Sequence, residues 1–475
     1  MEMAWAVVGL VAAAVGALYV RDRYIQKTHA VLRNYPVLGH FRYAFEELGF
    51  YFRQYWFTAD WEERPFDRMT RAWVYRSAKG VSNYIAFGGE ADLRVPGHVL
   101  FLHSPFPVNE DEIKPFDAPV IGAGCPNPYR PKSFFNISGM SYGALSSQAV
   151  QALSAGAAEA GIWMATGEGG LSPHHLSGGC DVVFQMGTAK YGVRDAEGHL
   201  SDARVAEVAA HPQVRMIEIK LSQGAKPGKG GILPGAKVTA EIAAIRGIPQ
   251  GQPSISPNRH REVVDVESLL ALINRVRRAA GKPVGIKFCL GEAGFLDDLF
   301  AVCAARPDEA PDFITVDGGE GGTGAAPAPL AEHMGLSIRQ SLPIVVERRA
   351  AHGLADRIRL IASGKLVTPD LVAWALCTGA DYVVSARGFM LSLGCIQSLK
   401  CDTGRCPTGI TTPDPRFTRG LDPKEKSVRV AGYARAMQHD VAMIAHSCGC
   451  THPGQLQPRH VRVVDANSGR AGSQV

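Results

Sequence analysis

Residues 219–248 read IKLSQGAKPGKGGILPGAKVTAEIAAIRGI. Arg215–Lys220 (RMIEIK), which lead into them, are typical of a short buried strand, and Ala236–Ile245 are typical of a helix. The glycine-rich loop between strand and helix carries several lysines, so backbone N–H groups and ammonium groups can converge there on an anion. A solvated basic loop is the alternative that these residues alone leave open.

Similar strand, loop and helix units recur from residue 131 onward. The expected strands are Phe134–Ile137, Ile162–Ala165, Val182–Met186, Met216–Lys220, Val284–Cys289, Phe313–Val316, Ile358–Ala362 and Tyr382–Ser385. Helical patterns lie between them at Ser147–Ala160, Val266–Ala280, Asp297–Ala305 and Pro369–Thr378. Repeated units of this kind predict a parallel sheet covered on both faces. Eight of them close most economically as a (β/α)8 TIM barrel, and a doubly wound open sheet is the alternative.

Glycines follow the expected strands, where a barrel builds its active site. Phosphate is commonly held after strands seven and eight, and the matching loops here are Ser363–Gly364–Lys365 and Ala386–Arg387–Gly388. Each offers glycine N–H groups and one cation. Gly319–Gly324 (GEGGTG) resembles a dinucleotide fingerprint, but Ala325–Pro329 (AAPAP) cannot open a helix directly after it. We therefore expect a flexible loop against a flat ligand instead.

Three cysteines form a compact set at Cys395, Cys401 and Cys406, with the spacing C-x5-C-x4-C-P. Thiolates this close can converge on one inorganic core, and three ligands without a histidine suit a three-iron cluster better than tetrahedral zinc. Structural or incidental cysteines are the alternative. A second group, HSCGCTH at residues 446–452, is too tightly spaced for a standard zinc site.

The composition limits the classes of partner. A net charge of +5 over 475 residues is too weak to indicate nucleic acid. Ten cysteines in so long a chain suit a reducing compartment rather than a disulfide framework.

The N-terminus is strongly apolar. Residues 4–20 (AWAVVGLVAAAVGALYV) contain no charge, and Arg21, Asp22, Arg23 and Lys27 follow them. This pattern predicts a single-span membrane anchor with the bulk of the chain cytoplasmic; a cleaved signal peptide is the alternative. The expected domains are the anchor at 1–22, a helical lead-in region at 23–120, the barrel at 121–440 with the cysteine loop at 395–406, and a C-terminal tail at 441–475.

Six motifs in one order carry a family resemblance: SGMSYGALS, TGEGG, KLSQGAKPGKGG, SISPNRH, DGGEGGTGA and GCIQSLKCDTGRCPTG. Between Phe134 and Pro415 the chain resembles the FMN-binding central domain of glutamate synthase, in its stand-alone, membrane-anchored form. The resemblance implies a (β/α)8 barrel, FMN, and a 3Fe-4S cluster on the three cysteines. It also implies hydride transfer from reduced flavin to 2-iminoglutarate, formed from 2-oxoglutarate and ammonia, to give L-glutamate.

The resemblance implies roles for individual residues. Expected around the keto-acid are Glu168, Lys220, Gln223, Lys226 and Arg246. Lys287 is expected to face the flavin ring. The remaining cofactor positions are expected at Met140, Ser141, Gly322, Gly364, Lys365, Arg387 and Gly388.

Two departures bear on the substrate. Lys229 and Ile232 stand where glutamate synthases usually have glutamate and glutamine, which leaves the identity of the keto-acid open. The 475 residues show no amidotransferase domain and no NAD(P)H site. Ammonia is therefore expected from solution or a separate subunit, and electrons from ferredoxin or a partner reductase through the cluster. A flavin oxidoreductase acting on another substrate, such as an N-substituted glutamate, and a non-catalytic barrel-fold binding protein are the alternatives.

Overall fold

The computed structural model describes residues 1–465, so the last ten positions of the predicted C-terminal tail lie outside the described residues. The chain divides into two compact units, Met1–Arg71 and Ala72–Val475. This division differs from the predicted boundaries at residues 22 and 120. Part of the lead-in region belongs with the barrel, because β1 (Val99–Phe101) pairs with β12 (Val461–Val463).

The first unit is helical. It contains α1 (Glu2–Val20), a π-helical turn (Arg21–Ile25), α2 (Ala30–Asn34), α3 (Gly39–Phe52) and a second π-helical turn (Arg53–Phe57). Helix α4 (Arg68–Ala78) crosses the boundary between the units. The most apolar 18-residue window of the segment Glu2–Ile25 has a mean hydropathy of 2.1 and no buried residue, so by length and composition this segment could cross a membrane.

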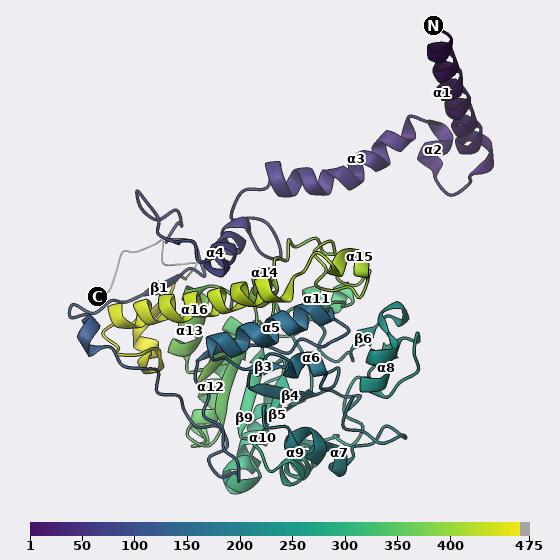
Figure 1. Cartoon of the computed structure of the whole chain (residues 1–475). Helices are drawn as coiled ribbons and strands as arrows, with labels where there is room; N and C mark the ends of the chain where they lie inside the picture. Colours follow the sequence, from purple (N-terminus) through teal and green to yellow (C-terminus); the bar gives the residue numbers. More distant parts are fainter. Residues whose placement is uncertain (466–475) are drawn as a thin grey trace. The chain divides into compact units, whose positions relative to one another are not determined.

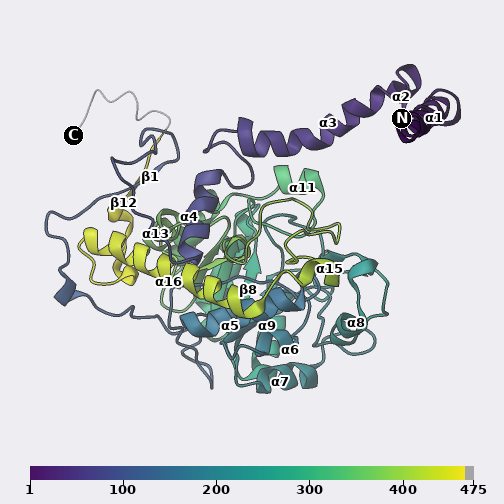
Figure 2. The ribbon, with the colours of Figure 1, turned by 45° about the horizontal axis from the view of Figure 1, so that its top comes forward.

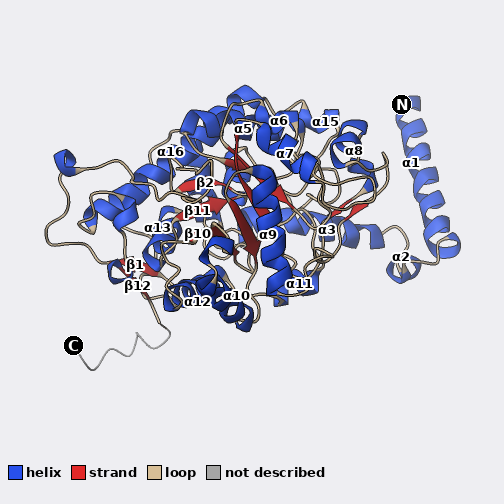
Figure 3. Ribbon diagram, turned by 90° about the horizontal axis from the view of Figure 1, so that it is seen from below, coloured by secondary structure: helices blue, strands red, loops and turns tan. Residues whose placement is uncertain are grey.

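The second unit contains a closed barrel of eight parallel strands, and Figure 3 shows its strands enclosed by helices. In barrel order these are β2 (Phe135–Ile137), β3 (Met164–Ala165), β4 (Val182–Met186), β5 (Val214–Lys220), β8 (Val284–Phe288), β9 (Phe313–Asp317), β10 (Arg359–Ser363) and β11 (Tyr382–Ser385). Pairing of β11 with β2 closes the ring. The TIM barrel prediction is confirmed, and the open-sheet alternative is wrong.

Helices follow the strands around the barrel. They are α5 (Ser147–Ala160), α6 (Pro173–Leu176), α7 (Asp202–Ala210), α9 (Val266–Ala280), α10 (Gly294–Ala305), α11 (Ala328–His333), α12 (Ile338–Ala351), α13 (Pro369–Thr378) and α14 (Arg387–Ser392). Capping defines their ends: the side chain of Ser146 accepts the Ala149 N–H at 3.3 Å, and Gly161 ends α5 with φ of 67°.

The chain closes with α15 (Pro415–Thr418) and α16 (Pro423–Ser447), and α16 packs along α5 (Figures 1 and 2). At Gly156 a Cβ would lie 2.5 Å from that of Val430, so only glycine allows this close approach. The predicted limit of the barrel domain at residue 440 falls inside α16, because this helix belongs to the barrel's outer layer.

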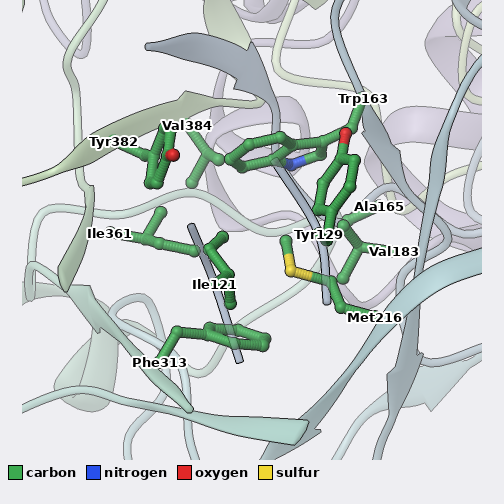
Figure 4. Close-up of a cluster of buried hydrophobic side chains, with 10 residues drawn as sticks. All are labelled: Ile121, Tyr129, Trp163, Ala165, Val183, Met216, Phe313, Ile361, Tyr382 and Val384. Atoms are coloured by element: carbon green, nitrogen blue, oxygen red, sulfur yellow. The ribbon is translucent and has the colours of Figure 1, made fainter. Parts of the chain in front are cut away.

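Apolar side chains fill the barrel interior below the active-site end. Figure 4 shows this cluster, which includes Trp163, Met216, Phe313 and Tyr382 from the strands and their immediate flanks. Ile121, which pairs with Tyr129 in an antiparallel bridge, contributes from outside the barrel strands. The interior is a packed core, so ligands are confined to the carboxyl ends of the strands.

A large excursion separates β5 from α9. It contains the antiparallel hairpin β6 (Ile232–Leu233) and β7 (Ser254–Ile255), a 3-10 turn (Gly235–Lys237) and α8 (Ala240–Arg246). The predicted helix starts later than expected, because the Thr239 side chain accepts the Ile242 N–H at 3.3 Å and caps it there.

Candidate active site

A pocket of about 510 Å³, including the space at its mouth, opens at the carboxyl ends of the barrel strands. Seven of the predicted site residues line it: Lys220, Gln223, Lys287, Gly322, Gly364, Lys365 and Arg387. Residues from five different strand-to-helix loops or strand ends are thereby brought together.

One end of the pocket combines glycines with cations. Gly364 has φ of 131°, a conformation that favours glycine. Arg387 donates to the Glu320 carbonyl and lies so close to Gly322 that a Cβ there would be 2.6 Å from its Nε. Burial lowers the pKa of Arg387 to about 10, against the opposing charges of Asp317 and Glu320, so the guanidinium stays charged at neutral pH. This end can hold a phosphate.

Gly388 does not line the pocket but shapes it. A Cβ at Gly388 would lie 2.2 Å from the hydroxyl oxygen of Tyr433, and that hydroxyl donates to the Val367 carbonyl at 3.0 Å. The bare backbone lets α14 and its Arg387 sit against α16.

Lys287, at the end of β8, is buried and lies 3.7 Å from Oδ2 of Asp317 at the end of β9. Asp317 also accepts from the Gly224 N–H at 3.0 Å and the Ser363 hydroxyl at 2.7 Å. Burial alone would raise the pKa of Asp317, but Lys287 and these donors hold it below its ordinary value. The sequence analysis missed Asp317; its place at the end of a strand, ahead of a glycine loop, was the available signal.

Gln185 on β4 is a second pocket residue that the sequence analysis missed. Its amide nitrogen donates to the buried carboxyl group of Glu218, and the hydroxyl of Thr315 donates to the other oxygen of that group. Because the nitrogen is engaged by Glu218, the carbonyl end of the Gln185 amide remains to accept hydrogen bonds in the pocket.

Four charged side chains meet beside the pocket. The Glu168 carboxylate lies 3.2 Å from the Lys220 ammonium, which also donates to Gln223. Burial alone would raise the pKa of Glu168, but the charges of Lys220, Lys226 and Arg246 outweigh it and hold that pKa below its usual value. Three cations and one carboxylate leave two positive charges, which suits a dicarboxylate.

Two of these cations have neutral direct partners. Lys226 donates to the Ala325 carbonyl at 3.2 Å. Arg246 donates to the Ser254 hydroxyl and the Tyr142 carbonyl, both at 3.3 Å, and its Nε is buried without a partner among the described residues. Burial lowers the pKa of both groups. Because the direct partners of Lys226 and Arg246 are neutral oxygens, an anionic ligand can pair with both positive charges.

Met140 and Ser141 lie in the loop after β2 and do not line the pocket. This loop touches the loop that carries Glu168, because a Cβ at Gly169 would lie 2.9 Å from both Ser141 and Arg246. The Met140 carbonyl lies 3.2 Å from Nε2 of buried His175. Burial lowers the pKa of His175 to about 4, so this ring is neutral at physiological pH and can fix the loop.

Lys229 and Ile232 both lie in the excursion after β5. Lys229 is exposed, and Ile232, 43% exposed, lies opposite Ile255, 67% exposed, in the β6–β7 hairpin. Nearby, His260 of the SISPNRH motif is buried and its Nε2 lies 3.1 Å from the Lys220 carbonyl. Burial lowers the pKa of His260 to about 4, so it supports Lys220 as a neutral ring.

Lys237, in the excursion between β5 and α9, joins that excursion to the loop that carries Cys395, Cys401 and Cys406. Its buried ammonium donates to the carbonyls of Cys401 and Thr411, both at 2.7 Å. Burial would raise the pKa of the Cys406 thiol, but hydrogen bonds from Thr408 and Thr411 lower it. Among residues 1–465 no three Cys, His, Asp or Glu side chains are placed to hold a metal ion. As arranged here, Cys395, Cys401 and Cys406 do not fit a cluster site, so the cluster stays a prediction.

Comparisons with known proteins agree with the motifs. A family model for the conserved region in glutamate synthase matches residues 113–451. The glutamate synthase large subunit-like protein YerD of Bacillus subtilis is 38% identical over 94% of this chain and 91% of its own length. The archaeal glutamate synthase (NADPH) of Methanocaldococcus jannaschii is 35% identical over 66% of this chain, which spans only 58% of that protein. A glutamate synthase large subunit-like protein of Rhizobium meliloti is 29% identical over 85% of this chain and 92% of its own length.

Proposed function

This chain belongs to the glutamate synthase family of oxidoreductases, and we propose that it uses FMN to convert 2-oxoglutarate and ammonia into L-glutamate. The observation that carries the proposal is the group of Glu168, Lys220, Lys226 and Arg246 beside the pocket, with its two excess positive charges. A dicarboxylate such as 2-oxoglutarate balances that charge.

The pocket's residues suit FMN. Gly364, Lys365 and Arg387 would hold its phosphate, and Gly388 keeps Arg387 in place. Lys287 would stabilise negative charge on the reduced ring, with Gly322, Met140 and Ser141 flanking it. When bound, FMN supplies the hydride for the reaction.

The protein's own residues orient the substrate and move its protons. Lys226 and Arg246 would bind the carboxylates, and Gln223 would orient the oxo group with Lys220. Condensation with ammonia gives 2-iminoglutarate and releases water; hydride addition to the imine carbon and a proton on its nitrogen complete the amino acid. Glu168, ionised because its pKa is depressed, can accept a proton from ammonia as the C–N bond forms.

The sources of ammonia and electrons follow the expectations from the sequence. We propose that ammonia comes from solution or a separate subunit, and that ferredoxin or a reductase is the electron donor. The cysteine spacing favours a 3Fe-4S cluster, but the arrangement of the thiols gives it no ready site, and no step is assigned to it. Iron analysis of wild type and Cys401→Ser tests the cluster: equal iron in both refutes it.

We further propose that Glu2–Ile25 anchors the protein in a membrane, with the barrel in the cytoplasm. The length and hydropathy of this segment support the anchor, and Arg21, Arg23 and Lys27 at its C-terminal end support the orientation.

A second candidate function is oxidation or reduction of another amino acid, such as an N-substituted glutamate. The exposed pair Ile232 and Ile255 on the β6–β7 hairpin favours it, because an apolar N-substituent could cover them. The proposed membrane anchor also favours this second function, because a reaction between 2-oxoglutarate and dissolved ammonia needs no attachment to a membrane.

The test is anaerobic reoxidation of the reduced flavoprotein, purified in detergent, by 2-oxoglutarate plus ammonium. Reoxidation with formation of glutamate supports the first function. A bound flavin that neither substrate reoxidises, but that an N-substituted glutamate reduces, supports the second. A protein that does not bind FMN refutes both and leaves a non-catalytic barrel.

A further inference from the structure

Helix α3 presents an apolar stripe that nothing in its own unit covers. Leu38, Phe41, Phe45 and Leu48 recur at intervals of three and four residues, and the stripe continues to Trp56. Phe41, Phe45 and Trp56 are 61%, 64% and 69% exposed. Since residues at this spacing share one face of a helix, the exposure is continuous rather than scattered.

The start of α3 is tied to the end of the candidate membrane span. The buried carboxylate of Asp22 accepts the Val37 N–H at 3.1 Å and lies 2.8 Å from Nε2 of His40. Gln26 bonds to the Asp22 and His29 carbonyls, and so fixes the chain between α1 and α2. These bonds turn the chain sharply, and α3 runs across the direction of α1 in Figures 1 and 2.

The chemistry of this segment suits a lipid surface. Arg21 and Arg23 lie in the last turn of the span, and Lys27 and Arg33 lie between the span and α3, where cations meet anionic headgroups. On α3 itself, Arg42 and Glu46 flank the apolar stripe, and Glu47 lies on the opposite face. An exposed apolar stripe bordered by charged side chains, next to a candidate membrane span, is typical of a helix lying in the membrane interface.

We propose that α3 lies in the plane of the membrane surface, with the stripe from Leu38 to Trp56 buried at the boundary between headgroups and acyl chains. This inference rests on the proposed anchor and adds a second attachment to it. A helix crossing the bilayer can rotate about its axis, whereas a span joined rigidly to a surface helix cannot. The lead-in region then holds the chain at the membrane by two contacts of different depth.

The test places the full chain in lipid nanodiscs of phosphatidylcholine and phosphatidylglycerol whose acyl chains are brominated near the headgroups. Bromine quenches tryptophan emission only at short range. The emission lost to shallow bromines is expected to decrease in Trp56→Phe and to stay unchanged in Trp163→Phe, whose tryptophan is buried in the barrel. Phe41→Ser combined with Phe45→Ser is expected to reduce quenching of Trp56 while the protein stays in the disc.

The outcomes separate the two proposals. If these bromines quench Trp5 but the loss of emission is the same in Trp56→Phe as in the wild type, the anchor stands and the surface helix is refuted. If Trp56 is shielded because the discs hold cross-linkable dimers, a second copy covers the stripe and the inference is likewise refuted. If the protein does not enter the discs at all, the anchor fails with it. Flavin reoxidation by 2-oxoglutarate and ammonium, measured on the same samples, reports the chemistry separately.

Discussion

Replacing Glu168 by glutamine separates two roles that its carboxylate can have: proton transfer, or simple neutralisation of the cations around it. The carboxylate oxygen lies 3.2 Å from the Lys220 ammonium. At an effective dielectric constant of about 20, this distance corresponds to a gross attraction of about 5 kcal/mol, most of which desolvation offsets. Glutamine keeps the volume and one acceptor, so the variant is expected to lose about 1.5–3 kcal/mol of unfolding free energy, the range for a charge-assisted hydrogen bond.

The kinetic expectation is sharper. If Glu168 accepts a proton from ammonia, kcat in Glu168→Gln falls roughly 10²- to 10⁴-fold, the usual contribution of general acid–base catalysis. The KM for 2-oxoglutarate does not rise, because removing a negative charge from among Lys220, Lys226 and Arg246 can only favour a dianion. The measurement is stopped-flow flavin reoxidation with saturating ammonium and varied keto-acid.

A matched control is Glu262→Gln. Its carboxylate lies 3.1 Å from the Lys190 ammonium, so it removes a comparable ion pair outside the pocket. We expect this variant to keep kcat. Unchanged kcat with a lower KM in Glu168→Gln would refute proton transfer and leave the carboxylate as a counter-charge only.

Three further outcomes are expected. Burial lowers the pKa of both His175 and His260 to about 4, against about 6.5 in the unfolded chain. Between pH 6.5 and 4 these histidines are therefore protonated in the unfolded chain but still neutral in the folded protein. The free energy of unfolding therefore falls by about 3 kcal/mol for each histidine as the pH drops from 6.5 to 4. Denaturant titrations at several pH values in this window should show that the free energy of unfolding of His260→Gln depends less steeply on pH than that of the wild type. An equal pH dependence would contradict the assignment. Arg387→Met should weaken FMN binding roughly 10- to 100-fold while riboflavin binding stays the same, by fluorescence titration; an equal loss for both ligands would place the phosphate elsewhere. Lys237→Met should speed hydrogen exchange of residues 401–411 and not of the barrel strands, because it breaks both bonds from Lys237 to the cysteine loop; unchanged exchange would show that the loop holds itself.

Local patterns were enough to predict the barrel. All eight strands could be found because each contains a short apolar run, and three helices, α5, α9 and α13, were predicted with correct ends. The predicted helix after β5 began too early, since Ala236 and Lys237 form a 3-10 turn before the Thr239 cap. The pairing of β1 with β12 joins residues more than three hundred positions apart, which no local pattern in the sequence predicts.

The site could be predicted only in part, because its electrostatics depend on register between strands. Lys220 and Lys287 are direct neighbours in the β5–β8 pairing, and like charges so placed repel each other. Each is accommodated by its own carboxylate, Glu168 at 3.2 Å and Asp317 at 3.7 Å, and both come from other loops or strands. The sequence of the basic loop alone therefore overestimates the net charge at Lys220, which Glu168 neutralises. The cations that remain for a dicarboxylate are Lys226 and Arg246, whose direct partners are neutral oxygens. Substrate recognition then follows from which lysines the closed barrel neutralises, and no count of basic residues along the sequence contains that information.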